Sequence, residues 1–287
     1  MKPTETKHRS TKALVESALL LALATVLSEL PLVELPYGGS VTVASMLPVL
    51  LISYRHGLLW GFGSATAFGV IQQLFGLKNL SYFSTWQSIV TLILLDYVVA
   101  FAIIGLGGIF RKQKSLPQWM QLLLGAVTVC VLRYICHVIT GATIWVGLSI
   151  PDSAALGYSL IYNATYMVPE TIILCLLTYY LGTVLDFRRD QLRRMPAVAA
   201  HSPLANWLFV LAGALGTGAL VFDVCAVFSR LQDAETGRFS VEGLRVERFA
   251  GSFWMWVVIV TAVAAVGMAV LLLVRRRLLS DHERVEQ

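Results

Sequence analysis

The sequence predicts an all-α integral membrane protein, and its hydropathy, its charge pattern and the length of its apolar runs support this prediction. Of its 287 residues, 57% are hydrophobic, and the mean hydropathy is +0.72. Charged residues make up only 14% and fall almost entirely in short segments between apolar runs. Most of these runs reach the roughly 20 residues that a helix needs to cross a bilayer. We expect eight spans, at residues 13–30, 42–54, 58–77, 86–110, 119–146, 156–185, 204–228 and 251–274.

Lysine and arginine residues predict the orientation of these spans. With the N-terminus inside, 16 of the 22 basic residues lie in cytoplasmic segments, five lie in outer segments and Arg133 lies within a span. The positive-inside rule therefore places both termini in the cytoplasm of a multi-pass cell-membrane protein. The net charge of +5 reflects this topology, so we expect membrane lipid and no nucleic acid around the chain. The four cysteines all fall in spans without a C-x-x-C pair, and we expect no disulfide, metal site or cofactor.

The first span and the connection after it carry two distinct signals. Ala18 and Ala22 lie four residues apart, and small residues at this spacing let a second helix approach closely in lipid. Alanine is common enough in spans that chance is the alternative explanation. The connection at 31–45 has two prolines, a Gly-Gly pair and no basic residue. It cannot be helical throughout, and we expect it to act as a lid over an outward-facing cavity.

Polar residues lie deep inside the next spans. The span at 86–110 contains Asp96 and Tyr97 about ten residues, or roughly 15 Å, from its outer end. In the span at 119–146, four residues spaced four apart form one stripe on a helix. The stripe comprises Arg133, His137, Gly141 and Trp145. Ionisable groups at this depth are costly unless they face protein, water or a ligand, so they indicate a functional site.

The span at 156–185 adds further polar and aromatic residues at a similar depth. It places Tyr158 and Asn163 in its first turns, and Pro169, next to Glu170, is expected to kink the helix. An acid, an imidazole, an amide and several aromatic rings at one depth predict a pocket for a flat, polar and cationic small molecule. Each residue also has a structural alternative: Asp96 can neutralise a nearby arginine, and aromatic residues often form interfacial belts.

Several short motifs identify a family resemblance over residues 13–185. They are Ala18-x-x-x-Ala22, Tyr37-Gly38, the acidic-Tyr pair at 96–97 and the glycine-rich segment 105–111. The most specific is basic-Tyr-x-x-His-x-x-x-Gly-x-x-x-Trp at 133–145, followed by Tyr158 and Asn163. The sequence resembles the thiamine-specific substrate-binding subunits of energy-coupling factor (ECF) transporters, the YuaJ-type thiamine transporter family.

This resemblance implies a fold, an activity and partners. It implies a six-helix substrate-binding domain at 1–187, with two additional C-terminal transmembrane helices here. It further implies high-affinity capture of thiamine, or a close relative, from outside. A transmembrane scaffold subunit and two ABC ATPase subunits would then energise uptake. The chain itself contains no G-x-x-x-x-G-K-[ST] phosphate loop, which agrees with ATP hydrolysis by separate subunits.

The resemblance also assigns roles to individual residues. It implies scaffold docking at Ala18 and Ala22, and ligand binding at Asp96, Tyr97, His137, Trp145, Tyr158, Asn163, Phe68 and Tyr37. Asp96 stands where the family has glutamate, Gly39 stands where it has a tryptophan, and Phe68 occupies a position that is often tryptophan. These departures predict a looser fit around part of the ligand.

The rest of the chain lies outside the resemblance. Residues 188–203 form a basic, proline-containing cytoplasmic linker, and 204–287 form a two-helix membrane extension without an assigned role. The alternative function is a stand-alone proton-coupled transporter with Asp96, His137 and Glu170 as a relay. No internal repeat of the kind common in such transporters is visible. We see no nucleophile–base pair or metal triad near a membrane face, so we do not expect an enzyme.

Overall fold

The computed structural model describes residues 3–35, 38–146, 155–195, 203–231 and 251–285. The chain divides into two compact units, Met1–Arg193 and Arg194–Gln287. We treat each unit by itself.

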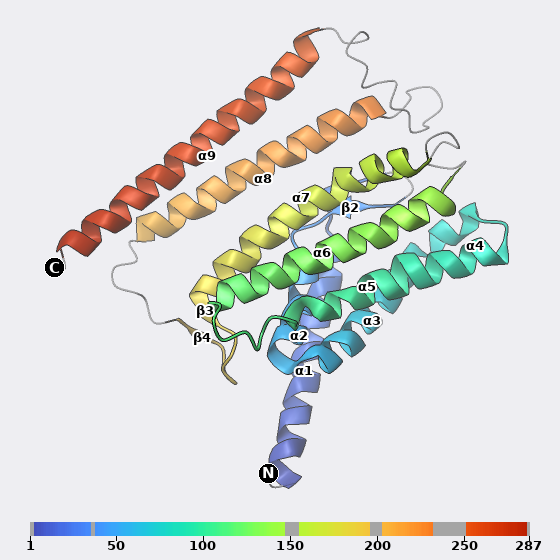
Figure 1. Ribbon diagram of the computed structural model, residues 1–287, viewed down its shortest axis with the longest axis horizontal. Coiled ribbons are helices and arrows are strands. Elements are labelled where there is room, and N and C mark those ends of the chain that lie inside the picture. The colour runs from blue at the N-terminus through green and yellow to red at the C-terminus, as the bar shows by residue number, and fades with distance from the viewer. Residues whose placement is uncertain (1–2, 36–37, 147–154, 196–202, 232–250, 286–287) are drawn as a thin grey trace. The chain divides into compact units, whose positions relative to one another are not determined.

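Six helical segments build the first unit, in the positions of the first six predicted spans (Figure 1). The first three are α1 (Pro3–Ser28), α2 (Met46–His56) and α3 (Leu58–Phe75). A run of short pieces forms the fourth: α4 (Trp86–Thr91), the π-helix η2 (Leu92–Val99), α5 (Ala100–Ala102) and the 3₁₀ helix η3 (Ile103–Gly108). The last two are α6 (Gln118–Thr143) and α7 (Ala155–Val184). The 3₁₀ helix η1 (Gly76–Tyr82) follows α3.

Five helical segments of the described chain are long and apolar enough to cross a membrane. They are Ser10–Ser28, Trp86–Gly108, Gln118–Thr143, Ala155–Val184 and Phe253–Leu279. Two predicted spans do not meet this description. With 11 residues α2 is too short, and α3 carries Gln72 and Gln73 near its end. In the predicted span at 204–228, the described residues Trp207–Gly216 form an apolar helical stretch. The prediction of an all-α, multi-pass membrane protein is confirmed.

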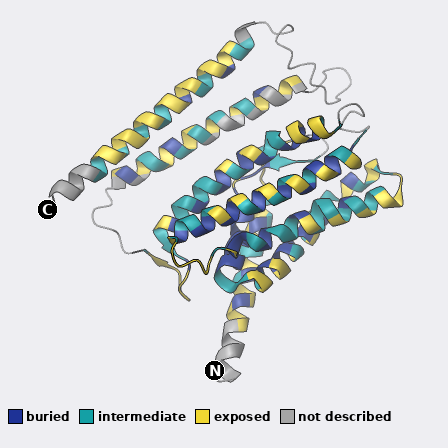
Figure 2. Ribbon diagram, viewed as in Figure 1, coloured by how far each residue is buried: buried dark blue, intermediate teal, exposed yellow. Residues whose placement is uncertain are grey.

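The core of the first unit surrounds α2, whose residues 46–54 are all buried (Figure 2). Fully buried side chains such as Leu50, Tyr54, Phe68 and Ile104 join α2 to α3 and η3. The glycines of η3 allow this close packing. A Cβ at Gly105 would lie 2.6 Å from the backbone nitrogen of Phe62, so no larger residue fits without moving α3. The glycine-rich segment is therefore a packing junction.

The helix α1 packs against the rest of the unit along only part of its length. Only 17% of the apolar stretch within Ser10–Ser28 is buried, and both Ala18 and Ala22 are exposed. Polar contacts near both ends of this apolar stretch attach it. The Nε of Arg55 lies 2.5 Å from the Oε1 of Glu16, and at the other end Gln72 donates to the Ser28 hydroxyl over 2.7 Å.

The segment between α1 and α2 is a short hairpin, as its prolines and glycines predicted for a non-helical connection. Its strands β1 (Val33–Glu34) and β2 (Ser40–Val41) are antiparallel, with Val33 opposite Val41. The strand β2 lies beside α7 (Figure 1). This places residues 38–42 next to the middle of a long helix.

After α7 come two short strands, β3 (Leu185–Asp186) and β4 (Arg193–Arg194). The second unit is then a hairpin of two long helices, α8 (Pro203–Leu231) and α9 (Gly251–Val285) (Figure 1). Polar and charged side chains of the two helices contact each other. The hydroxyl of Thr261 donates to Asp223 over 2.7 Å, and the Arg230 guanidinium lies 4.1 Å from the centre of the Phe253 ring. The predicted loop between them, 232–250, lies outside the described residues.

Candidate ligand-binding site

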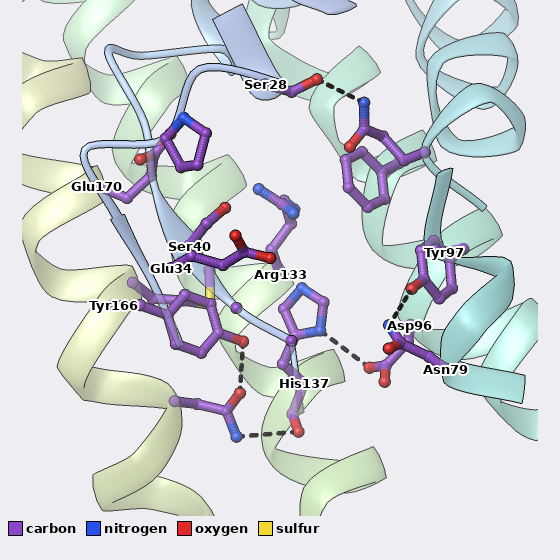
Figure 3. A pocket seen from close by; sticks show the side chains of 18 of the residues that line it. Ser28, Glu34, Ser40, Asn79, Asp96, Tyr97, Arg133, His137, Tyr166 and Glu170 are labelled. Carbon is purple, nitrogen blue, oxygen red and sulfur yellow. Dashed lines mark hydrogen bonds and ion pairs between the residues drawn. The ribbon is translucent and has the colours of Figure 1, made fainter. Parts of the chain in front are cut away.

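A cavity of about 340 Å³ lies within the first unit, near the ends of η2, α6 and α7 that face the hairpin (Figure 3). Its walls come from η2, α6 and α7, the hairpin segment, and the adjoining ends of α1 and α3. Small-molecule sites in proteins typically have volumes of about 300–1,000 Å³. The cavity is therefore large enough for a compact organic ligand.

Asp96 is the best-connected polar residue of the cavity. Its Oδ1 lies 2.9 Å from the Nδ1 of His137 and also accepts a hydrogen bond from the Thr140 hydroxyl. Its Oδ2 accepts a hydrogen bond from the indole N–H of Trp145 over 3.2 Å. The side chains of Asp96 and His137 are only 12% and 13% exposed. His137, Thr140 and Trp145 thus hold this largely buried carboxylate in a fixed orientation.

The π-helix η2 explains how two consecutive residues both reach the cavity. Such wide turns, bonded from residue i to i+5, occur frequently at functional sites. Asp96 and Tyr97 both line the cavity from this turn. The Tyr97 hydroxyl accepts a hydrogen bond from Asn79 over 3.0 Å, and its ring stacks on Phe101 with 6.3 Å between centroids.

Trp145 lies just beyond the helix on which the sequence placed it. The helix α6 ends at Thr143, so the fourth residue of the expected helical stripe stands in a bend, which corrects that expectation. The backbone N–H of Trp145 bonds the carbonyl of Thr140 over 3.3 Å. The ring packs edge-on against Phe83 with 5.0 Å between centroids. These contacts bury the indole to 8% exposure against Asp96.

Asn163 lines the cavity from α7, and most of its polar atoms bond protein groups. Its amide nitrogen donates to the backbone carbonyls of Ser159 and His137, over 2.9 and 3.2 Å. Its Oδ1 accepts from the Tyr166 hydroxyl over 2.6 Å. The remaining lone pair of Oδ1 is the part of this side chain that can meet a ligand.

Two other predicted site residues, Tyr158 and Phe68, do not line the cavity. Tyr158 is half-buried on α7, about one turn before the cavity-lining residues, and is not among them. Phe68 is fully buried in the core, where its ring packs edge-on against Phe101 at 5.4 Å. Tyr37 lies outside the described residues.

The cavity also contains residues that the sequence did not assign to ligand binding. Tyr162, Tyr166 and Glu170 line it from α7, and their spacing of four is the signal that could have found them. Arg133 lines it from α6 (Figure 3). Its guanidinium contacts the sulfur of Met46 at 2.6 Å and the face of Phe101 at 4.5 Å.

Among the described residues, no carboxylate lies within ion-pair distance of Arg133. Asp96 instead bonds His137, Thr140 and Trp145. The alternative in which Asp96 only neutralises Arg133 does not describe this structure. The cavity therefore has an anionic pole at Asp96 and a separate cationic pole at Arg133.

A helical membrane bundle that encloses a polar and aromatic cavity defines a class of protein, the membrane proteins that bind a small solute. A sequence model of the thiamine transporter protein family (Thia_YuaJ) matches residues 14–187. The chain belongs to this family, and it is a transporter rather than an enzyme.

Two individual proteins are similar to this chain. The thiamine transporter ThiT of Bacillus subtilis (strain 168) is 36% identical over 178 residues, which cover 57% of this chain and 88% of the relative. A solved structure of ThiT from Listeria monocytogenes is 22% identical, with a TM-score of 0.49, and the match covers 61% of this chain and 94% of that one.

Proposed function

We propose that this protein is a high-affinity binding subunit for thiamine and delivers it into the cell with partner ATPases. The observation that carries the proposal is the buried Asp96 carboxylate, held by His137 and Trp145 in a cavity of suitable size. Its setting within the family-matched residues 14–187 supports the same ligand.

The chemistry of the cavity suits the chemistry of thiamine. Thiamine joins a positively charged thiazolium ring to an aminopyrimidine and carries a short hydroxyethyl chain. The Asp96 carboxylate favours the cation, and the rings of Trp145 and Tyr166 offer faces and edges for two flat heterocycles. The unpaired guanidinium of Arg133 suits the hydroxyl oxygen as a hydrogen-bond acceptor.

Uptake in this proposal depends on other subunits. The sequence contains no phosphate loop, so ATP hydrolysis must come from partners, which we take to be an ECF scaffold subunit and two ABC ATPases. The exposed pair Ala18 and Ala22 on α1 supports helix-to-helix docking of the scaffold. The excess of basic residues supports an arrangement with both termini in the cytoplasm.

Calorimetric titration of the detergent-purified protein tests the ligand assignment. We expect saturable thiamine binding without ATP or an ion gradient. The separate thiazolium and aminopyrimidine halves of thiamine serve as matched controls, and each should bind much more weakly than the whole molecule. An absence of heat up to high micromolar thiamine would contradict the proposal.

Proton-driven uptake is the competing mechanism, and liposomes separate the two. The protein alone in liposomes should take up no thiamine beyond its own binding capacity when a pH gradient is imposed. Sustained accumulation would favour the proton-coupled alternative. The geometry gives that alternative no continuous relay, because both carboxylate oxygens of Glu170 are hydrogen-bonded to Thr42 and not to His137.

A further inference from the structure

Three cavity residues of α7 form a stripe that contacts the hairpin. Tyr162, Tyr166 and Glu170 are spaced by four and therefore share one face of the helix. We call them the α7 stripe. Each touches one residue of the hairpin segment 38–42.

The three contacts differ in kind. The Tyr162 hydroxyl donates to the carbonyl of Gly38 over 2.9 Å. The Tyr166 ring lies so close to Gly39 that a Cβ there would sit 2.9 Å from it. Both glycines have positive φ angles, +97° and +90°, a region that a residue with a side chain adopts at a cost. At Gly39, glycine lets the backbone lie directly on the Tyr166 ring.

The third contact, between Glu170 and Thr42, is the strongest of the set. The carboxylate accepts the backbone N–H of Thr42 at 2.5 Å and its hydroxyl at 2.7 Å, one donor on each oxygen. Hydrogen bonds to an ionised acceptor are stronger than bonds between neutral groups. The Thr42 hydroxyl in turn accepts the N–H of Ser45 over 3.0 Å, directly before α2 begins. One carboxylate therefore ties the end of β2 and the start of α2 to α7.

The burial of Glu170 indicates that this contact is specific. Glu170 is only 6% exposed, and among the described residues no basic side chain lies within ion-pair distance of it. A buried carboxylate without an ion pair at contact distance is unfavourable unless hydrogen bonds compensate it, and Thr42 supplies these bonds. An apolar residue at position 170 would avoid the problem and lose the attachment.

We propose that Glu170 is a positioning residue that holds the hairpin segment 38–42 over the cavity through Thr42 and so slows the escape of the ligand. It acts on the ligand's dissociation rate, not by contacting the ligand. The ligand readout of this inference rests on the proposed thiamine-binding function.

A double-mutant cycle tests whether Glu170 works through Thr42. The variants are Glu170→Gln, Thr42→Val and the combination, with Thr42→Ser as the conservative control that keeps both donors. Release of labelled thiamine into excess unlabelled thiamine gives the dissociation rate. We expect release about tenfold faster in Glu170→Gln, several-fold faster in Thr42→Val and unchanged in Thr42→Ser.

The double variant, Glu170→Gln with Thr42→Val, gives the decisive measurement. If the two residues act through one contact, Thr42→Val should have little further effect in the Glu170→Gln background, whereas independent residues show additive effects. Full additivity would overturn the proposal, because Glu170 would then act on the ligand directly. An unchanged release rate in Glu170→Gln would overturn it as well.

Hydrogen exchange of the ligand-free protein supplies a readout that needs no thiamine. In Glu170→Gln the peptide covering residues 38–45 should exchange faster, while peptides from α3 keep their wild-type protection. Uniformly faster exchange would show a general structural role, and unchanged exchange at 38–45 would show that no attachment was lost. Either result overturns the inference. If the wild-type protein binds no thiamine, the proposed function fails, and this measurement still tests the attachment.

Discussion

At the scale of single residues, the cavity brings together side chains from three consecutive helical segments of the chain. A rise of about 1.5 Å per residue places residues of neighbouring helices at comparable depths. Asp96, His137, Trp145 and Asn163 do line one cavity. That Phe68 faces the core could not be predicted, because its direction depends on how α3 is rotated against its neighbours.

The charge of Asp96 is predicted to support ligand binding more than the fold. Asp96→Asn keeps the shape and most hydrogen bonds but removes the anion that faces the ligand. We expect the protein to stay folded and to lose roughly 1.5–3 kcal/mol of binding free energy, the scale of a hydrogen bond to a charged group, or about ten- to a hundredfold in affinity. Asp96→Glu should retain binding.

Two measurements on each variant decide this prediction: the melting temperature without ligand and the Kd for thiamine. A large fall in melting temperature with an unchanged Kd would assign Asp96 to the fold instead.

At the scale of elements, the hydropathy pattern predicted the positions of the helices better than their hydrogen-bonding pattern. Apolar runs located the first six helical segments, and the prolines and glycines at 31–45 excluded a continuous helix there. The π-turn η2 was not predictable, because its bonding pattern depends on how the helix packs against α3 and α6. The strands β1 and β2 are too short to leave a periodic signal.

The junction between η3 and α3 is predicted to tolerate no side chain at Gly105. A Cβ there would lie 2.6 Å from a backbone atom of α3, so Gly105→Ala should separate the helices and cost about 1–3 kcal/mol of unfolding free energy. Gly63→Ala is the matched control within α3, because a Cβ at Gly63 meets nothing within 4 Å. Thermal unfolding in detergent compares them. Equal melting temperatures would contradict the close packing described for η3.

The exposed face of α1 is predicted to serve uptake and not ligand binding. Ala18→Trp or Ala22→Trp should abolish thiamine uptake in cells, because bulk at either position keeps a partner helix away. Thiamine affinity of the purified protein should not change. Leu59→Trp on α3, at a site 88% exposed, is the control for adding an indole to an exposed apolar surface. Loss of uptake in the control as well would remove the argument for docking at α1.

At the scale of the whole molecule, the family match and the described cavity both fall within the first unit. The family match ends at residue 187, and the first compact unit ends at Arg193. The described cavity-lining residues all belong to this unit. The two-helix extension α8–α9 was expected as an addition from its hydropathy, but neither its sequence nor its internal contacts assign it a role.

Removal of residues 204–287 is therefore predicted to leave thiamine affinity unchanged. The reason is that the cavity, its hairpin and the α7 stripe belong to residues before 194. Calorimetric titration of the shortened and full-length proteins measures the effect. A tenfold or greater loss of affinity in a shortened protein of unchanged helicity would show that the extension contributes to the site.

The hydrogen bond from Trp145 to Asp96 makes one indole a built-in optical probe of the site. The emission energy of an indole responds to the electric field along its ring, and here the carboxylate lies 3.2 Å from the ring nitrogen. A cation that approaches Asp96 changes this field before anything else in the chain has to move. The chain has seven tryptophans, so the difference spectrum against Trp145→Phe isolates this one. Occupancy of the cavity can then be followed in real time in the purified protein and without a label.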